Sequence, residues 1–326
     1  MTPTDTKPPL SCSIVLLTKC VLKCKMCHMW KTDNRQELSI EEWKGFIEKL
    51  CVLFEGKGEI VISGGEPLLK EGVLDLVTFC KKMGLKAIMV SNAFLIDKEM
   101  AKRIAGSGLD QISISMDSYI EETHDFLRGV PGSYKKVISA IDHLKKEKNS
   151  PRVEIITVIS GKNLAQVREH ADWARRQGRI DSLYFQAIAC PFFSSAGKRW
   201  YAESEFGFLW PRDTIEAGRI IDELIELKER DNFISNPVSQ LKLFKSYFEN
   251  PEKRVTDKKC RSGDYVLNVD NAGNVLLCCF DRAIGNIKNS DIKSLWYSKE
   301  ADQLRTKMRN CALACNNIVN CFFKEE

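Results

Sequence analysis

The sequence has none of the features that would place it in a membrane or outside the cell. Its N-terminus, MTPTDTKPPLSCSIVLL, has no basic segment, and the apolar run SIVLL is far too short for a signal peptide or a membrane span. No low-complexity segment occurs in the 326 residues, which are enough for one large domain and a smaller one. We therefore expect a cytoplasmic protein with no membrane partner.

Histidine is scarce, at four residues, whereas cysteine is abundant, at 13. His124, His143 and His170 lie in helical patterns among charged residues, so we expect them at the surface. Thiols stay reduced in the cytoplasm, and an odd number of cysteines therefore favours metal ligands, catalytic thiols and core residues over a disulfide framework. The formal net charge is only +5, and thiolates bound to metal would lower it further, so nucleic-acid binding gets no support.

Strand-like and helical patterns alternate six times before residue 190. Runs rich in β-branched residues predict strands at 12–18, 58–64, 86–92, 110–117, 152–160 and 182–189. Helical periodicity predicts helices near 40–54, 71–83, 97–106, 134–147, 165–176 and 213–230. Such repeats form parallel sheets with right-handed crossovers. Six units favour an α/β fold of the partial (β/α)6 barrel type over a closed eight-stranded barrel, and a twisted open sheet is the alternative.

The pattern changes after residue 250. The stretch DYVLNVDNAGNVLLCCF predicts a β-hairpin, a helix is expected near 291–308, and the tail CALACNNIVNC is rich in cysteine. We predict a barrel at 1–210, a connecting helical segment at 211–255 and a small cysteine-rich hairpin and helix domain at 256–326. A core this small indicates a stabilising metal.

Every predicted strand ends in polar, glycine or cysteine residues. The strand ends carry Cys20, Cys24 and Cys27, then Gly64 to Pro67, Ser91 and Asn92, Ser115 and Asp117, Ser160 to Asn163, and Cys190. Because the C-terminal ends of parallel strands share one edge of the sheet, these residues indicate an active site there.

The cysteine spacing and the second strand end together carry a family resemblance. The pattern C-x3-C-x2-C at Cys20, Cys24 and Cys27, followed by Gly-Gly-Glu-Pro, resembles the radical S-adenosylmethionine (SAM) enzymes over residues 12–190. The resemblance implies a [4Fe-4S] cluster held by three thiolates, whose fourth iron binds SAM. It also implies reductive cleavage of SAM to a 5'-deoxyadenosyl radical that abstracts a hydrogen atom from a substrate. A zinc site completed by His28 is the alternative, but it leaves Gly-Gly-Glu-Pro unexplained.

The same resemblance implies the residues that bind SAM. Gly64, Gly65 and Glu66 would hold the methionine amino group, the glycines because backbone must approach the ligand closely, and Pro67 would stiffen the turn. Met26 would cover the adenine. Residues placed like the ribose and methionine contacts of the family are Ser91, Asn92, Ser115 and Asp117, although these residue types are equally usual as helix caps.

Arg128 has two candidate partners. It could pair with the SAM carboxylate, or with a carboxylate on a helix. The resemblance leaves both open.

The C-terminal cysteines resemble the auxiliary-cluster domains of this family, called SPASM and, in shortened form, twitch. SPASM has seven cysteines for two clusters, whereas this region has six, namely Cys260, Cys278, Cys279, Cys311, Cys315 and Cys321. The resemblance implies one auxiliary [4Fe-4S] cluster, held by Cys260, Cys278 and two of the last three. Neighbours on a strand point to opposite faces, so only one of Cys278 and Cys279 should ligate. A zinc site is again the alternative.

The substrate is left open. The radical could act on a peptide or protein side chain, by oxidation, cross-linking or epimerisation, or could oxidise or epimerise a small molecule such as a sugar or cyclitol. Cys190 could return a hydrogen atom to a substrate radical or be an inert thiol. The aromatic stretch CPFFSSAGKRWYAESEFGFLWP could wall a substrate pocket or fill the space between domains. An electron donor such as flavodoxin or ferredoxin is the expected partner.

Overall fold

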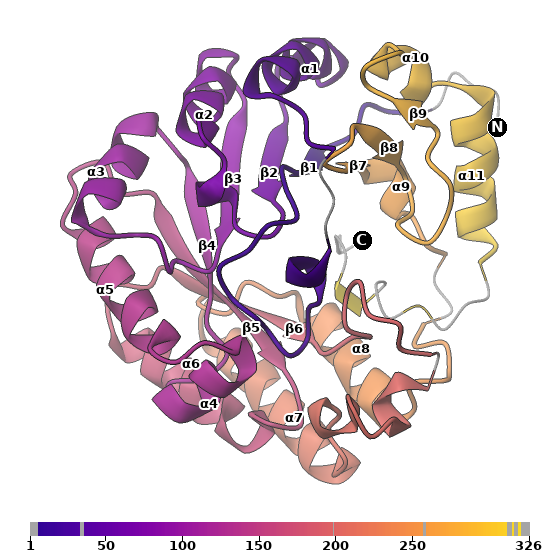
Figure 1. Ribbon diagram of the computed structural model, residues 1–326. Helices are drawn as coiled ribbons and strands as arrows, with labels where there is room; N and C mark the ends of the chain where they lie inside the picture. The colour runs from indigo at the N-terminus through magenta and orange to yellow at the C-terminus, as the bar shows by residue number, and fades with distance from the viewer. Residues whose placement is uncertain are drawn as a thin grey trace.

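The strands of the protein join into a single curved sheet. The computed structural model describes residues 6–32, 36–197, 199–256, 259–311, 315 and 319–320, and within them the sheet has nine strands in the order β6-β5-β4-β3-β2-β1-β7-β8-β9. Strands β1 to β6 are parallel and comprise Ser11–Val15, Glu59–Ser63, Lys86–Ser91, Gln111–Ser115, Arg152–Ile159 and Ser182–Ala187. The sheet bends into part of a barrel, with helices around its outer side (Figure 1). The predicted open α/β barrel is confirmed.

The helices between these strands begin and end within a few residues of the predicted positions. Helices α1, α2, α3, α5, α6 and α7 comprise Ile40–Leu53, Val73–Lys82, Lys98–Ser107, Ser133–Lys145, Val167–Arg176 and Thr214–Arg230. The start of α1 illustrates the local cause: Ser39 Oγ accepts a hydrogen bond from Glu42 N, and the Glu42 carboxylate accepts one from Ser39 N. Two helices without a clear sequence signal are α4 (Glu121–Arg128) and α8 (Val238–Glu249).

The expectation of surface histidines is wrong for two of the three. His124 and His170 are 1% and 0% exposed, whereas His143 is partly exposed. His170 belongs to the buried stripe of α6, together with Val167 and Ala171, and its charged sequence neighbours lie on the other face of the helix. Burial lowers the pKa of His124 to about 3 and that of His170 to about 4, so both rings are neutral at pH 7.

The C-terminal hairpin continues the barrel sheet. It consists of β7 (Val266–Val269) and β8 (Asn274–Leu276), which pair antiparallel as predicted, and β9 (Gly285–Asn286) follows. β7 also pairs in parallel with β1, so the two ends of the chain meet in the middle of the sheet.

The helix expected near 291–308 is two helices, α10 (Ile292–Trp296) and α11 (Lys299–Arg309), because Ser298 caps the second. The buried Arg305 guanidinium fixes α11 to the hairpin, donating to the carbonyls of Gly263, in α9 (Ser262–Tyr265), and Trp296.

The free edge of β6 is covered by a short backbone bridge and by two asparagine side chains. Leu183 bonds to the backbone of Phe233 and Ser235. Further along the same edge, the backbone groups of Phe185 are paired with one side chain. The Phe185 N–H donates to Asn236 Oδ1 at 2.6 Å, and the Phe185 carbonyl accepts from Asn236 Nδ2 at 2.9 Å. Asn320 binds Ala187 in the same two-bond manner. An edge covered in this way cannot recruit a further strand.

We expect Asn236→Leu to lower the free energy of unfolding by roughly 2–4 kcal/mol, because both backbone groups of Phe185 would lose their buried partner. Urea unfolding followed by circular dichroism measures this. Asn232→Leu, at an exposed position four residues away, serves as the control and should change little. Equal unfolding midpoints for the two variants would contradict the assigned role of Asn236.

Candidate active site

The three cysteines predicted to hold a cluster lie together in the loop after β1. Cys20, Cys24 and Cys27 are each partly buried, and both Cys20 and Cys27 are close enough to Cys24 to raise its pKa. Burial is the larger cause, and it raises the pKa of Cys24 to about 11 and those of the other two thiols as well. Thiolates would form here only if a cationic group compensated for the lost hydration, and bound iron supplies that charge.

The described side chains form no ready-made site for a single metal ion. Within the described part of the chain, no group of three or more His, Cys, Asp or Glu side chains is arranged to hold one metal ion, as tetrahedral zinc would require. In a [4Fe-4S] cluster each thiolate binds a different iron, so the sulfurs lie further apart.

The cysteine loop is fixed by backbone hydrogen bonds to the turn after β2. Gly65 N donates to Leu17 O at 2.8 Å, and Glu66 N donates to Lys19 O at 3.0 Å. A Cβ on Gly65 would lie 2.1 Å from Lys19 O, and Gly64 has a φ of +138°, where side chains are disfavoured. The two glycines therefore allow the turn and the cysteine loop to touch.

Two other elements hold the same loop. Lys23 N and Lys25 N donate to the carbonyls of Arg128 and Leu127 at the end of α4, at 3.1 and 2.8 Å. His28 N donates to Phe192 O at 2.7 Å in the segment after β6. A short 3-10 helix, η2 (Met29–Lys31), ends the loop. Met26 is buried at 8% exposure, beside the third cysteine.

Glu66 gathers the predicted residues at the ends of β2 and β3. Its fully buried carboxylate accepts hydrogen bonds from Ser91 Oγ at 2.9 Å, from Asn92 N at 2.8 Å and from Leu68 N at 3.1 Å. Burial outweighs these bonds and raises the pKa of Glu66 to about 7. Asn92 Nδ2 also points to Cys20 Sγ at 3.5 Å. Pro67 opens the 3-10 helix η3 (Pro67–Leu69) behind this carboxylate.

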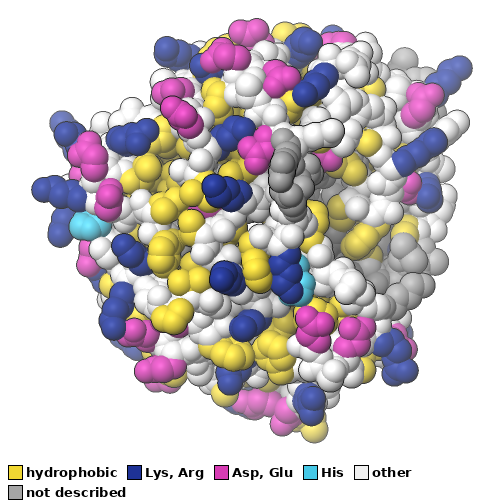
Figure 2. Space-filling view, in the orientation of Figure 1, with side chains coloured by type: hydrophobic (Ala, Val, Ile, Leu, Met, Phe, Trp, Pro, Cys, Tyr) yellow, Lys and Arg dark blue, Asp and Glu magenta, His cyan; other side chains and the backbone are white. Residues whose placement is uncertain are grey.

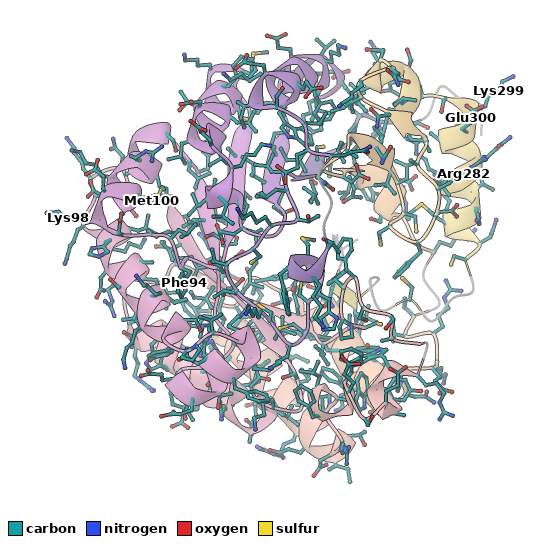
Figure 3. All side chains as sticks on the ribbon, viewed as in Figure 1. Phe94, Lys98, Met100, Arg282, Lys299 and Glu300 are labelled. Carbon is teal, nitrogen blue, oxygen red and sulfur yellow. The ribbon has the colours of Figure 1, made fainter. Side chains whose placement is uncertain are left out.

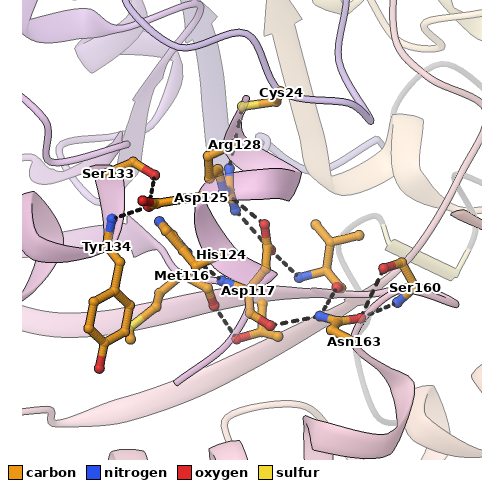
Figure 4. Close-up of polar contacts among 12 residues, drawn as sticks. Cys24, Met116, Asp117, His124, Asp125, Arg128, Ser133, Tyr134, Ser160 and Asn163 are labelled. Carbon is orange, nitrogen blue, oxygen red and sulfur yellow. Dashed lines mark hydrogen bonds and ion pairs between the residues drawn. The ribbon is translucent and has the colours of Figure 1, made fainter. Parts of the chain in front are cut away.

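A buried ion pair lies on the other side of the cysteine loop (Figure 4). Arg128 Nη2 donates to Asp117 Oδ1 at 2.9 Å, and Arg128 Nη1 is 3.9 Å from Cys24 Sγ. Arg128 and Asp117 are 8% and 1% exposed. Burial alone would lower the pKa of Arg128, but Asp117 and Cys24 raise it overall. The partner of Arg128 in the structure is thus a carboxylate of the protein, as one of the two alternatives expected. That carboxylate, Asp117, follows the end of β4 and does not lie on a helix.

Residues outside the predicted SAM contacts hold Asp117 in place. Its Oδ1 also accepts from Val158 N at 3.1 Å, its N–H donates to His124 Nδ1 at 3.3 Å, and its carbonyl accepts from Asn163 Nδ2 at 2.7 Å (Figure 4). Ser115, two residues earlier, is partly exposed at the end of β4. The sequence signal for Asn163 was its position directly after a predicted strand. For the buried His124 there was none.

The predicted auxiliary ligands form a second group of thiols. Burial and then the neighbouring Cys278 and Cys311 raise the pKa of Cys260, so these three lie close together. Cys278 is partly buried and Cys279 is exposed, but both lie beyond the end of β8, so the alternation expected on a strand does not apply to them. Cys321 lies outside the described residues.

Cys190 lies near Tyr247, two residues before the Phe192 that bridges to Cys27. Burial raises the pKa of Tyr247, and Cys190 and Cys315 raise it further, so both thiols lie near this tyrosine. Burial also raises the pKa of Cys190 itself.

The aromatic stretch after β6 divides into a buried part and an exposed part. Trp200 and Trp210 are 1% and 8% exposed, and the Trp210 ring packs 5.1 Å from that of Tyr247. Phe192 and Phe193 are 55% and 57% exposed. The tryptophans thus belong to the core, and the phenylalanines are free to contact another molecule.

Comparison with known families decides what this arrangement is. Residues 14–174 match the radical SAM superfamily, and residues 260–321 match the iron-sulfur cluster-binding SPASM domain. The chain belongs to the radical SAM superfamily. A radical SAM protein with this C-terminal domain takes SAM, a SAM-binding [4Fe-4S] cluster and an auxiliary iron-sulfur cluster. None of the helices in the described part is long and apolar enough to cross a membrane.

Several curated proteins resemble this radical SAM protein. The AdoMet-dependent heme synthase of Methanosarcina barkeri (strain Fusaro / DSM 804) is 29% identical over 167 residues, which is 51% of this chain and 47% of the relative. The Fe-coproporphyrin III synthase of the same organism is 25% identical over 316 residues, 90% of this chain and 74% of the relative. The sporulation killing factor maturation protein SkfB of Bacillus subtilis (strain 168) is 30% identical over 184 residues, 56% of this chain and 43% of SkfB. The first and third matches thus span about half of each relative or less.

Solved structures share the fold. SuiB of Streptococcus suis bound to S-adenosylmethionine matches with a TM-score of 0.69 and 17% identity, over 91% of this chain and 68% of that chain. Native anSMEcpe with bound AdoMet and Cp18Cys peptide matches with a TM-score of 0.68 and 20% identity, over 91% and 82%. These likenesses support the barrel and its C-terminal extension as one architecture.

Gly65→Ala should expel the cysteine loop from its position, because the added Cβ would lie 2.1 Å from Lys19 O and 2.5 Å from Thr18 O. We expect iron in the anaerobically reconstituted protein to fall from about eight to about four per chain, as the auxiliary cluster stays. Gly45→Ala is the matched control, since a Cβ there meets nothing within 4 Å. Unchanged iron in Gly65→Ala would refute the close-approach argument.

Proposed function

We propose that this radical SAM protein abstracts a hydrogen atom from a peptide or protein side chain. Cys20, Cys24 and Cys27 would hold the cluster, which when bound would supply the electron for reductive cleavage of SAM and so the radical that abstracts hydrogen. The observation that carries the peptide part is the bridge between Cys27 and Phe192, which brings two exposed phenylalanine rings beside the cluster loop.

The geometry around these phenylalanines favours a large substrate. Phe193 has a φ of +59°, an unusual conformation for a bulky residue, and such strain is typical of sites that contact ligands. Its ring and that of Phe192 are turned to solvent rather than into the core. A peptide backbone with apolar side chains could lie across this surface and present one residue to the radical.

The residues of the SAM site have distinct proposed roles. Glu66, with the Gly64 and Gly65 backbone, would bind the methionine ammonium, since it is a buried carboxylate near Cys20. Arg128, held by Asp117, would keep a positive charge beside Cys24 and toward the SAM carboxylate. Proposed contacts for the rest of SAM are Met26, Pro67, Ser91, Asn92 and Ser115. Cys190 remains a candidate hydrogen donor to a substrate radical, and the auxiliary cluster would be held by Cys260, Cys278 and two of Cys311, Cys315 and Cys321.

A small-molecule substrate is the second candidate. It is supported by the match to Fe-coproporphyrin III synthase, which extends over 90% of this chain. An iron porphyrin carrying carboxylate side chains is then the compound to test. Exposed aromatic rings beside the cluster loop would suit a flat macrocycle as well as a peptide.

The deciding experiment compares wild type with Cys20→Ala/Cys24→Ala/Cys27→Ala after anaerobic reconstitution. We expect about eight irons in wild type and about four in the variant, with 5'-deoxyadenosine formed from SAM and dithionite by wild type alone. If a short gene lies next to the one for this chain, adding its peptide product should speed deoxyadenosine formation and change that peptide's mass.

The same assay separates the two candidates. If the iron porphyrin speeds deoxyadenosine formation and is itself converted, and the peptide does neither, the small-molecule proposal replaces the peptide proposal. Equal deoxyadenosine from wild type and variant would refute the assignment of the radical-generating cysteines.

The role of Glu66 predicts a pH dependence for SAM binding. With a pKa of about 7, the carboxyl group is protonated and neutral below pH 7, and it attracts an ammonium group only above it. SAM affinity should therefore fall as the pH drops from 8 to 6. Glu66→Gln should bind SAM about 10- to 100-fold more weakly than wild type at pH 8 and lose this pH dependence.

Anaerobic equilibrium dialysis with labelled SAM measures both effects. The control is Glu71→Gln, at an exposed glutamate in the same connection after β2, which should behave as wild type. Parallel pH profiles for wild type and Glu66→Gln would remove Glu66 from the site.

A further inference from the structure

The cysteine loop has an outer face whose charge the SAM chemistry does not use. Between residues 16 and 32 there are four lysines and no Asp or Glu. Lys23, Lys25 and Lys31 of this loop are exposed, as is Lys162 after β5. No carboxylate among the described residues lies within ion-pair distance of these four amino groups. Figure 2 shows Lys and Arg side chains gathered among hydrophobic ones across the middle of this face.

Aromatic rings lie beneath these amino groups. Lys25 Nζ and Lys162 Nζ are 5.6 and 4.8 Å from the centre of the Phe126 ring. Lys23 Nζ and Lys31 Nζ are 6.0 and 5.3 Å from that of Trp30. Phe126 is 42% exposed. Contacts of this kind hold lysines over a flat apolar surface without neutralising them. We call Lys23, Lys25, Lys31 and Lys162, with Phe126 and Trp30, the basic-aromatic face.

The direction of the side chains separates this face from the reaction site. Lys23 N and Lys25 N both bond to the end of α4, and burial alternates along this piece of loop: Lys23 and Lys25 are exposed, whereas Cys24 between them is partly buried. Cys24 therefore points inward, to Arg128, while its two lysine neighbours point to solvent. The basic-aromatic face thus includes the two residues that flank this thiol in the sequence.

Acidic side chains nearby offset only part of this charge. Glu121, Glu122 and Asp125 of α4 share a hollow with Lys25. Glu121 is 2.9 Å from Lys135, however, and the Asp125 carboxylate accepts bonds from Ser133 Oγ and from two backbone N–H groups. These two carboxylates thus have partners on the α5 side.

We propose that the basic-aromatic face is the docking surface for an acidic one-electron carrier protein. The inference rests on the proposed role of Cys24 as a cluster ligand. The carrier would be oxidised by one electron, the cluster reduced by one, and that electron would be consumed when the bond between sulfur and C5' of SAM breaks to give methionine and the deoxyadenosyl radical. Charge complementarity and the short path to Cys24 both favour a carrier. A substrate must instead reach the inner side of the loop, where Glu66 and Arg128 lie.

The test measures 5'-deoxyadenosine formation from SAM without substrate, with reduced flavodoxin or with dithionite as the electron source. The variant Lys25→Glu/Lys162→Glu reverses two charges on the face. Lys98→Glu/Lys299→Glu makes the same change in net charge at exposed positions on opposite edges of the molecule, as Figure 3 shows. The double variant should raise the KM for flavodoxin at least tenfold at low salt, while the dithionite-driven rate and the iron content stay those of wild type. The control should match wild type with both donors.

Several outcomes would overturn the proposal. One is an unchanged KM for flavodoxin in Lys25→Glu/Lys162→Glu, and another is an equal rise in the control. A fall in the dithionite-driven rate would assign the lysines to the cluster or to SAM. An unchanged flavodoxin KM with lost binding of an acidic peptide or a carboxylated porphyrin would make the face a substrate surface. Because no substrate enters the main assay, its result does not depend on whether the proposed peptide function is right.

Discussion

The active end of the molecule depends on the close approach of three backbone segments to one loop. The loop that carries Cys20, Cys24 and Cys27 is bonded through main-chain atoms to the turn after β2, to the end of α4 and to the segment after β6. Main-chain bonds require short separations, so no side chain fits at Gly65 or at Gly129, where a Cβ would lie 2.1 Å from Lys23 O. The spacing of the thiols is thus set by the barrel rather than by the side chains of the loop.

Burial gives this site an unusual relation to protons. It raises the pKa of all three thiols and of Glu66, so the protein alone favours their neutral forms. Iron and an ammonium group bind the deprotonated forms, and assembly of the site must therefore release protons. For Asp117 the protein itself supplies the counter-charge, in the Arg128 guanidinium. The charge of Asp117 is therefore balanced within the chain, whereas the charges of the thiolates and of Glu66 would be balanced only when iron and SAM bind.

Local sequence signals account for the features that were predictable. Alternating apolar runs and helix caps such as Ser39 located the barrel strands and most helices, because both patterns act over a few residues. The cysteine spacing and Gly-Gly-Glu-Pro identified the superfamily for the same reason. Cys20, Cys24 and Glu66 are within reach of one another, as strand ends on one edge should be.

Features that arise from packing between distant segments were not predictable. His170 looked like a surface residue because its neighbours in sequence are charged, but the helix turns it toward Thr157 of β5. The partner of Arg128 depends on how α4 packs against the end of β4. The sequence pattern of either element does not predict that packing. The basic-aromatic face needs Lys162, from another loop, to meet Phe126. The joining of β7 to β1 likewise depends on residues from opposite ends of the chain.

This last pairing constrains the order in which the protein can fold. β1 lies inside the finished sheet, between β2 and β7, but β7 comes from the last quarter of the chain. During synthesis from the N-terminus, β1 must therefore remain an unpaired edge until residues 266–269 leave the ribosome. The cysteine loop that follows β1 is attached to this edge strand during the same interval. Completion of the sheet and maturation of the radical-generating loop are thus coupled through one strand, and the long sequence separation predicts slow final folding.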